Sequence, residues 1–442
     1  MMWVVVAAIC VVAVWGLFNP FAGLLGLLAI NVIQPGEIYP VLNTFRVERA
    51  VAILVLISLV LHHGRLVFPR ITKLFLIFWA TMFLSVLLAF WRTGAFMTAL
   101  DFGKTVIYHV LIINLVNTRR RFHTFLFVFV ILIGWFAGSS INAYRHGEYY
   151  YGGEHLARAE GLTSSGGNPN ELGLTLVSAL PLAALLVLSG TSRDRIVGLA
   201  VAGMSVWAVL ITGSRSSFLT MIALLGAFIF SKKKRLLFLP IAAALLALIW
   251  AVTPPEYKQR YTSGVETRDQ DESYLNRKLA WEAGWAMWKD YPLTGVGAGN
   301  FADADGAKYW PDADPTRRHW LNAHSLYLQL LAELGLIGVI AFSYFVFQLY
   351  RLNRRMSEGL ARLDDAPKWL RLFPTACSLC LFVLLLDGYS SHDLYRSTWY
   401  MLAAMSACVS TMISEQAPIR EPLKARFGRR RPIEAPSAVG AQ

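Results

Sequence analysis

Charged side chains are scarce in this 442-residue sequence. Asp, Glu, Lys and Arg make up 16% of it, whereas hydrophobic residues make up 56%, and the mean hydropathy is +0.48. Soluble chains carry about 25% charged residues. The shortage of charge therefore excludes an ordinary soluble globular protein.

The apolar stretches also lack the alternation of polar and apolar residues that marks the strands of a membrane barrel. They run continuously instead, as in Ile71–Phe90 and Leu236–Val252. A helix needs about 20 such residues to cross a bilayer, and backbone inside lipid must be hydrogen-bonded within helices or a closed barrel. The sequence therefore predicts an all-α polytopic membrane protein.

Cysteine is nearly absent: only Cys10, Cys377, Cys380 and Cys408 occur, all in apolar segments. Cys377 and Cys380 have CxxC spacing, but no His or further Cys stands near them, so we interpret them as small packing residues rather than a zinc or redox site. The N-terminal apolar stretch lacks a basic segment ahead of it, so a cleaved signal peptide is not expected.

The net charge is +13, and the basic residues collect in every second loop between apolar segments. This is the distribution of the positive-inside rule, so these loops are predicted to be cytoplasmic and nucleic-acid binding is not expected. About twelve transmembrane helices follow if Met2–Ile33 crosses once. Its Asn19-Pro20 break leaves two short spans as the alternative, which would put the N-terminus outside. The other eleven are expected at about 47–62, 71–90, 101–117, 123–142, 171–189, 195–212, 216–230, 236–252, 322–350, 370–387 and 397–413.

These spans divide the chain into four parts. Transmembrane helices occupy 1–252, a large outward loop domain occupies 253–321, helices resume at 322–413, and a basic cytoplasmic tail occupies 414–442. Loops as long as 253–321 are usually functional, and Leu279–Trp288 within it predicts a helix that lies along the membrane or caps a cavity. The other outward loops are expected at about 34–46, 91–100, 143–170, 213–215 and 388–396.

The first segment with candidate functional side chains is Asn322–Gly338, at the outer end of a long span. An imidazole such as His324 titrates near neutral pH and can accept a proton in catalysis. The alternative is an interfacial histidine bonded to its own helix end. Glu333 lies deeper in the same span, and a carboxylate there needs a donor such as a backbone amide or a basic neighbour.

A second polar segment is Ile211–Phe218, a short outward turn that carries Arg215. A guanidinium there is suited to bidentate capture of phosphate, although an arginine at lipid headgroups can also simply snorkel. A third is Arg158–Gly173, in which Asn168-Pro169-Asn170 should begin the next helix.

The segment Arg277–Phe301 contains a GxGxG pattern. No βαβ context surrounds it, so we interpret it as a tight turn rather than a nucleotide site. The pairs Asp303/Asp305 and Asp312/Asp314 resemble metal-binding DxD motifs, but exposed aspartates of a turn-rich loop explain them better.

Taken in order, these segments resemble the O-antigen ligase family. The resemblance covers about residues 158–340 and rests on Arg-x-x-Gly…Asn-Pro-Asn, a Ser-Arg hairpin, Pro-Leu-x-Gly-x-Gly-x-Gly-Asn-Phe, and Asn-x-His-Ser-x-Tyr…Glu-x-Gly. It implies a metal-independent, inverting glycosyltransferase of GT-C-like architecture, without cofactors, in the bacterial inner membrane with a periplasmic active site. The donor it implies is a glycan on undecaprenyl diphosphate, and the acceptor is lipid A–core.

The resemblance also implies roles for four residues. His324 would be the general base, and Arg158, Arg215 and Arg277 would hold the diphosphate, with Arg215 also serving catalysis. An O-antigen polymerase or a protein O-oligosaccharyltransferase would use the same donor and stays an alternative. A lipid-linked sugar flippase is less favoured, because transporters place polar residues near the bilayer midplane and often show repeated halves.

Overall fold

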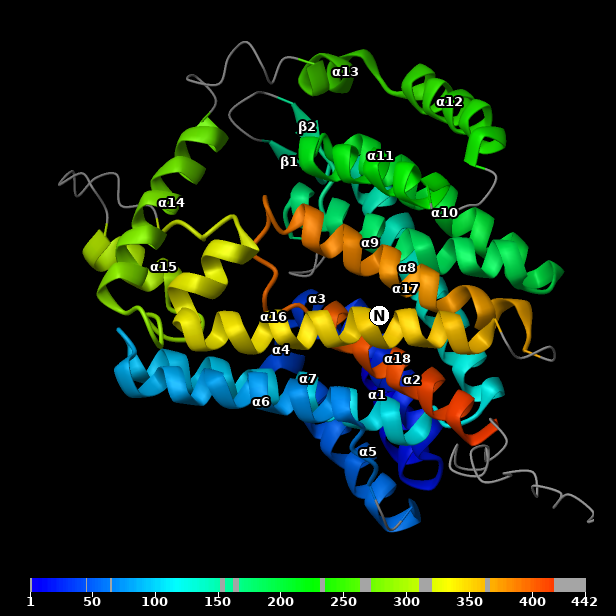
Figure 1. The fold of residues 1–442 in the computed structure, drawn as a ribbon, viewed down its shortest axis with the longest axis horizontal. Coiled ribbons are helices and arrows are strands. Elements are labelled where there is room, and N and C mark those ends of the chain that lie inside the picture. The colour runs from blue at the N-terminus through cyan, green and yellow to red at the C-terminus, as the bar shows by residue number, and fades with distance from the viewer. Residues whose placement is uncertain are drawn as a thin grey trace, which may run out of the picture.

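The computed structural model describes residues 2–44, 46–63, 66–151, 156–161, 167–230, 235–262, 272–309, 320–361 and 366–416. Nearly all of them are helical (Figure 1). The helices are α1 (Met2–Phe18), α2 (Pro20–Ile33), α3 (Pro35–Ile38), α4 (Pro40–Thr44), α5 (Val47–His63), α6 (Arg70–Ser85), η1 (Val86–Leu88), α7 (Arg92–Leu115), α8 (Arg119–Arg145), α9 (Pro169–Ser189), α10 (Ser192–Thr212), α11 (Arg215–Phe230), α12 (Arg235–Val252), α13 (Pro255–Thr262), α14 (Glu272–Asp290), α15 (Phe301–Ala304), η5 (Asp305–Tyr309), α16 (Leu326–Leu360), α17 (Lys368–Asp387) and α18 (Ser397–Gln416). The strands are β1 (Tyr150–Tyr151) and β2 (Ala157–Arg158), paired antiparallel.

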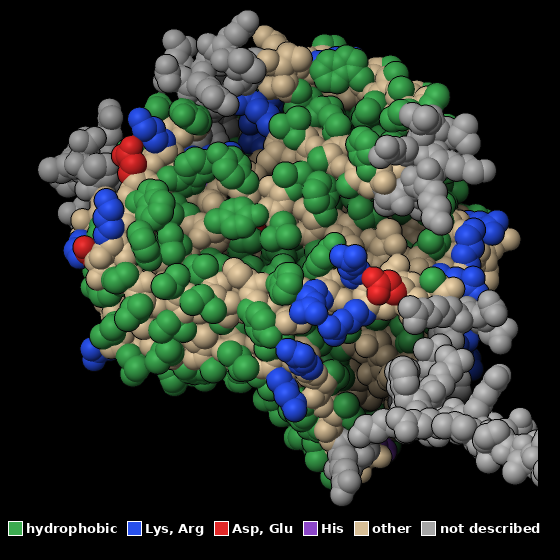
Figure 2. Space-filling model, viewed as in Figure 1, with side chains coloured by type: hydrophobic (Ala, Val, Ile, Leu, Met, Phe, Trp, Pro, Cys, Tyr) green, Lys and Arg blue, Asp and Glu red, His purple; other side chains and the backbone are tan. Residues whose placement is uncertain are grey.

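The protein is an all-helical, multi-pass membrane protein. Among the described residues, seven helices are long and apolar enough to cross a membrane, or eight if the bent pair of α12 and α13 is one span; α1, α2 and α11 are shorter apolar helices. Apolar side chains cover most of the face seen in Figure 2, and Lys and Arg gather toward its right-hand side. The count of twelve spans, which assumes that Met2–Ile33 crosses once, stays a prediction.

Every apolar segment expected to span the membrane forms a helix, but two loop boundaries were wrong. The expected outward loop at 91–100 is helical, because α7 begins at Arg92 and the segment holds no residue that stops a helix. The loop expected at 143–170 is shorter, since α8 continues to Arg145, and it contains the β1–β2 hairpin. Strands of two residues show no alternation that a sequence could reveal.

The N-terminal stretch forms two helices that fold back on each other. A Cβ at Gly16 of α1 would lie 3.1 Å from the Cα of Gly23 in α2, and one at Gly26 would lie 2.2 Å from Val12. In one continuous helix, residues seven apart would be about 10 Å apart along the axis. The contacts therefore require an antiparallel hairpin with its turn at Asn19, and the side chain of Asn19 caps α2 by accepting from the Ala22 N–H.

Several helix ends meet at one end of the bundle. The N–H of Leu326, which opens α16, donates to the carbonyl of Gly388 after α17 (2.7 Å). Arg396, just before α18, donates to Thr175 near the start of α9 (2.6 Å). In Figure 1, α16 crosses the molecule beneath α17, and α14 and α15 lie over the end where α16 begins. The loops between these helices therefore share one region.

The helix expected within 253–321 is confirmed as α14, which buries Ala280, Ala283 and Met287 in a small apolar cluster beside the start of α16. The chain then returns through a glycine-rich turn that lies against a break in α16. Gly335 has φ +60° there, and a Cβ on it would lie 2.4 Å from the Leu293 backbone. No other residue fits this approach without moving the backbone.

Candidate functional site

His324 lies in the loop just before α16, whose N-cap is Ser325. Its backbone is in the left-handed region, with φ +45°, which few non-glycine residues adopt outside functional or strained sites. Its ring meets the ring of His392 edge to face, with centroids 5.4 Å apart. Burial, helped by His392 and by the positive charge of Arg277, lowers the pKa of the His324 imidazole from 6.5 to about 4. The ring is therefore neutral at pH 7 and can accept a proton.

Arg277 projects from α14 toward this histidine, and its charge also acts on the carboxylate of Asp387 at the end of α17. Asp387 is 2% exposed, and it accepts a hydrogen bond from Thr220 of α11 (3.5 Å). Ser216, one turn earlier on α11, also interacts with it. Asp387 thus connects the loop domain, α11 and α17.

Two further arginines, Arg158 and Arg215, form a second group near the turn between α10 and α11. Arg158 on β2 donates from Nε to the carbonyl of Thr212 (2.7 Å) and from a terminal nitrogen to Asn170 Oδ1 (3.2 Å). Arg215, the first residue of α11, donates to the carbonyl of Arg260 (3.0 Å). Burial lowers the pKa of the Arg158 guanidinium, and the positive charge of Arg215 lowers it further. Two guanidinium groups this close favour binding of an anion.

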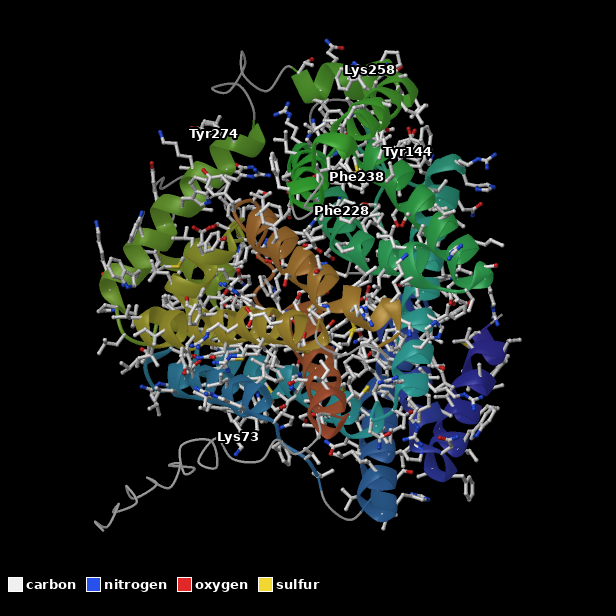
Figure 3. All side chains as sticks on the ribbon, turned by 45° about the vertical axis from the view of Figure 1, so that its right-hand side comes forward. Lys73, Tyr144, Phe228, Phe238, Lys258 and Tyr274 are labelled. Atoms are coloured by element: carbon white, nitrogen blue, oxygen red, sulfur yellow. The ribbon has the colours of Figure 1, made fainter. Side chains whose placement is uncertain are left out.

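Arg260 of α13 belongs to the same group and was missed in the sequence. Its Nε donates to the carbonyl of Gly213 (2.7 Å), at the turn that ends α10. Beside it, the hydroxyl groups of Tyr144 and Tyr257 are 2.9 Å apart, and Figure 3 shows Tyr144 near Lys258 of α13. These contacts hold α13 against the turn that carries Arg215. The only sequence signal was the position of Arg260 within the long loop.

The beginning of α9 connects the two groups. Asn170 accepts the hydrogen bond from Arg158, and the next residue, Glu171, lies 3.9 Å from His392 (Oε1 to Nε2). The helix begins at the Asn-Pro-Asn pattern as predicted, but its cap is Asn168, which accepts from the N–H groups of Asn170 and Glu171, rather than Asn170, the cap expected from the sequence. Arg158 therefore contacts the start of α9 directly, and His324 is linked to it through His392 and Glu171.

Glu333 has the backbone donor that the sequence required for it. Its carboxylate accepts from the Gly299 N–H (2.8 Å) and from Gln329 (3.4 Å), and from the Tyr395 hydroxyl. The glycine-rich segment is a turn, as expected: Gly295 has φ +69°, and a Cβ on it would lie 2.3 Å from the Glu333 backbone. The turn thus lies directly against α16. Glu333 of α16 is also bonded to Tyr395 of the α17–α18 loop.

Of the two DxD pairs, Asp303/Asp305 lies within the described residues. Asp305 accepts from the Leu321 N–H (3.1 Å), and burial raises the pKa of its carboxyl from 3.8 to about 6. Asp312 and Asp314 lie outside the described residues. Within the described ranges, no three His, Cys, Asp or Glu side chains group as metal ligands. Asp305 is therefore a buried hydrogen-bonding residue, 1% exposed, and the interpretation of this pair as exposed aspartates was wrong for it, because the chain folds back over it at Leu321.

The site combines a neutral imidazole with several guanidinium groups, which suits removal of a proton beside a bound phosphate. Residues 199–343 match the family model described as O-antigen ligase, a segment that includes Arg215, Arg277 and His324 but not Arg158. No protein of curated function matches the chain. Residues 199–343 of this membrane protein thus match the O-antigen ligase family, whose enzymes are glycan ligases or polymerases.

Proposed function

We propose that this protein is an O-antigen ligase that transfers a glycan from undecaprenyl diphosphate to lipid A–core at the periplasmic face of the bacterial inner membrane. Its family supports a lipid-linked glycan as substrate. The observation that carries the proposal is that His324 lies within the charge of Arg277 and packs on His392, which faces the start of α9 where Arg158 binds. The same proposal includes a GT-C-like architecture.

The reaction forms one bond and breaks another. The acceptor hydroxyl oxygen attacks the anomeric carbon of the donor sugar, and the bond from that carbon to the diphosphate oxygen breaks. The diphosphate leaves with the electron pair, and the hydroxyl proton passes to His324. Attack from the face opposite the leaving group inverts the anomeric centre, so the base and the arginines act on opposite faces of the sugar.

The arginines bind the diphosphate and stabilise the charge that grows on it as it leaves. The positive charge of Arg215 acts on the guanidinium of Arg158, so an anion bound between the two offsets that repulsion. Guanidinium groups present paired N–H donors that match phosphate oxygens. This donor set requires no divalent metal ion.

Donor binding also prepares the base. In the empty site, the positive charge of Arg277 helps to lower the pKa of His324. A bound diphosphate offsets that charge, so the pKa of the imidazole rises toward the range in which it is an effective base near neutral pH. His324 therefore becomes most basic when the donor is present.

The test is the surface polysaccharide of a deletion strain, complemented with the parent gene or with His324→Ala. A ligase is indicated if lipid A–core loses its polymer while full-length polymer accumulates on the carrier lipid. Accumulation of single repeat units would identify a polymerase instead, and loss of glycan from proteins alone would identify an O-oligosaccharyltransferase. Unchanged surface glycans would contradict all three.

A further inference from the structure

A second histidine, His392, contacts the proposed base and has no role in the reaction as described above. It lies in the loop between α17 and α18, and its ring packs at 86° against that of His324, with centroids 5.4 Å apart. His324 occupies a left-handed backbone conformation. The contact with His392 restricts the direction in which its ring can point. No motif in the sequence predicts this contact, because only the fold brings the two loops together.

On its other side, His392 faces a carboxylate. Its Nε2 lies 3.9 Å from Oε1 of Glu171, and the two side chains are 23% and 24% exposed. Glu171 lies in the first turn of α9, so its carboxylate reaches water. A path of ionisable groups therefore leads from His324 through His392 to Glu171 and solvent.

The proposed reaction needs a route by which His324 loses its proton, and this path supplies one. After each transfer, His324 holds the proton of the acceptor hydroxyl, and the ring must lose it before the next cycle. Arg277 and burial both disfavour the charged ring, so the proton leaves readily if an acceptor is near. His392 is the neighbouring group that can take it.

We propose that His392 is a positioning residue that acts through His324: it orients the ring of His324 and accepts its proton, which then passes to Glu171 and to water. In the transfer, an N–H bond of His324 breaks and one on His392 forms. The proton then moves to a Glu171 oxygen, and release to water restores all three groups. This inference rests on the proposed function.

The charged groups around His324 and His392 should make the effect of His392 on transfer depend on pH. His324 is faced by His392 and by Arg277 of α14. His392 is faced by Glu171 of α9 and by Arg396, which precedes α18. Because His392 helps to lower the pKa of His324, its removal should raise that pKa. The acidic limb of the pH profile of kcat/KM should therefore move to higher pH in His392→Gln.

The experiment uses the purified full-length protein with lipid-linked donor and lipid A–core acceptor. For His392→Gln we expect kcat to fall by at least about tenfold, less than the 10²–10⁴-fold typical of a direct base, with the KM for donor unchanged. Added imidazole should restore much of the rate to His392→Ala, because it can enter the space left by the ring. His146→Gln is the matched control: this exposed histidine bonds the Asn142 carbonyl of its own helix, and its replacement should change nothing.

The proposal is overturned if His392→Gln keeps the parent kcat, if only its KM changes, or if its acidic limb stays in place. Parallel assay of His324→Ala separates this failure from failure of the proposed function. If His324→Ala is inactive while His392→Gln is normal, only the role of His392 is wrong. If His324→Ala also transfers at the parent rate, the proposed function itself has failed.

Discussion

The carboxylate of Glu333, inside α16, accepts a hydrogen bond from the backbone N–H of Gly299, in the turn that follows α14. It also accepts from the hydroxyl of Tyr395 in the α17–α18 loop. One buried side chain therefore joins the loop domain to the loop that carries His392. The relative position of these two loops therefore depends on this connection.

Removing one donor from Glu333 should loosen this end of the molecule. Tyr395→Phe leaves a buried carboxylate oxygen without its hydroxyl partner, which costs about 1–3 kcal/mol of stability. We expect a lower thermal midpoint for the purified protein in detergent. Tyr389→Phe is the control, because that side chain is 63% exposed. Equal midpoints for the two variants would show that the connection does not stabilise the fold.

The sequence predicted the helices well, because continuous apolar runs leave the backbone few other choices in lipid. It also predicted that Glu333 needs a donor such as a backbone amide or a basic neighbour, since burial of a carboxylate requires one, and the Gly299 amide is such a donor. It could not predict that His392 and Glu171 join the site. Those contacts depend on how the start of α9 meets the α17–α18 loop, and neither residue belongs to a motif with a recognisable spacing.

The topology of the chain should follow its loop charges. Reporter tags after Gln442 and at 232–235 should lie in the cytoplasm, and a tag near Asp312 should lie in the periplasm. Because α1 and α2 form an antiparallel hairpin, a tag before Met1 should report the side of the loop at 34–46, which is the periplasm. A cytoplasmic N-terminus would instead support the single first span, and a cytoplasmic Asp312 would place the loop domain on the wrong side for the proposed reaction.

Transfer should not require a divalent metal ion, because arginines carry the charge of the diphosphate. Purified protein with lipid-linked donor should keep its rate in EDTA. Asp303→Ala should also be tolerated, because the proposed reaction assigns no role to this carboxylate. If chelation abolishes turnover and Mg²⁺ or Mn²⁺ restores it, a metal ion rather than the arginines stabilises the charge of the leaving diphosphate.

The pH dependence should separate the empty and the donor-bound site. The profile of kcat/KM reports the free enzyme, so its acidic limb should lie near pH 4, where His324 becomes protonated. The limb of kcat should lie at higher pH, because the bound diphosphate offsets the charge of Arg277. The residual rate of His324→Ala should lack this limb. A free-enzyme limb near 6.5, the ordinary histidine value, would show that the site does not lower the pKa of this ring.

The arginine that opens α11 should act on the diphosphate rather than on the proton. Arg215→Lys keeps the charge but loses the paired donors, so both Arg215→Lys and Arg215→Ala should weaken donor binding and slow transfer. Loss of one such electrostatic contact should cost about 3 kcal/mol in the transition state. Equilibrium binding of the lipid-linked donor, followed by single-turnover transfer, measures the two effects. Normal binding by Arg215→Ala would exclude this contact.

The central claim, that His324 is the base, is tested most directly by single-turnover transfer in His324→Ala with the donor already bound. The account predicts a folded protein that binds the lipid diphosphate as the parent does and transfers the glycan about 10²–10⁴-fold more slowly. Transfer at the parent rate, or a loss of activity that comes only from failure to bind the donor, would contradict it.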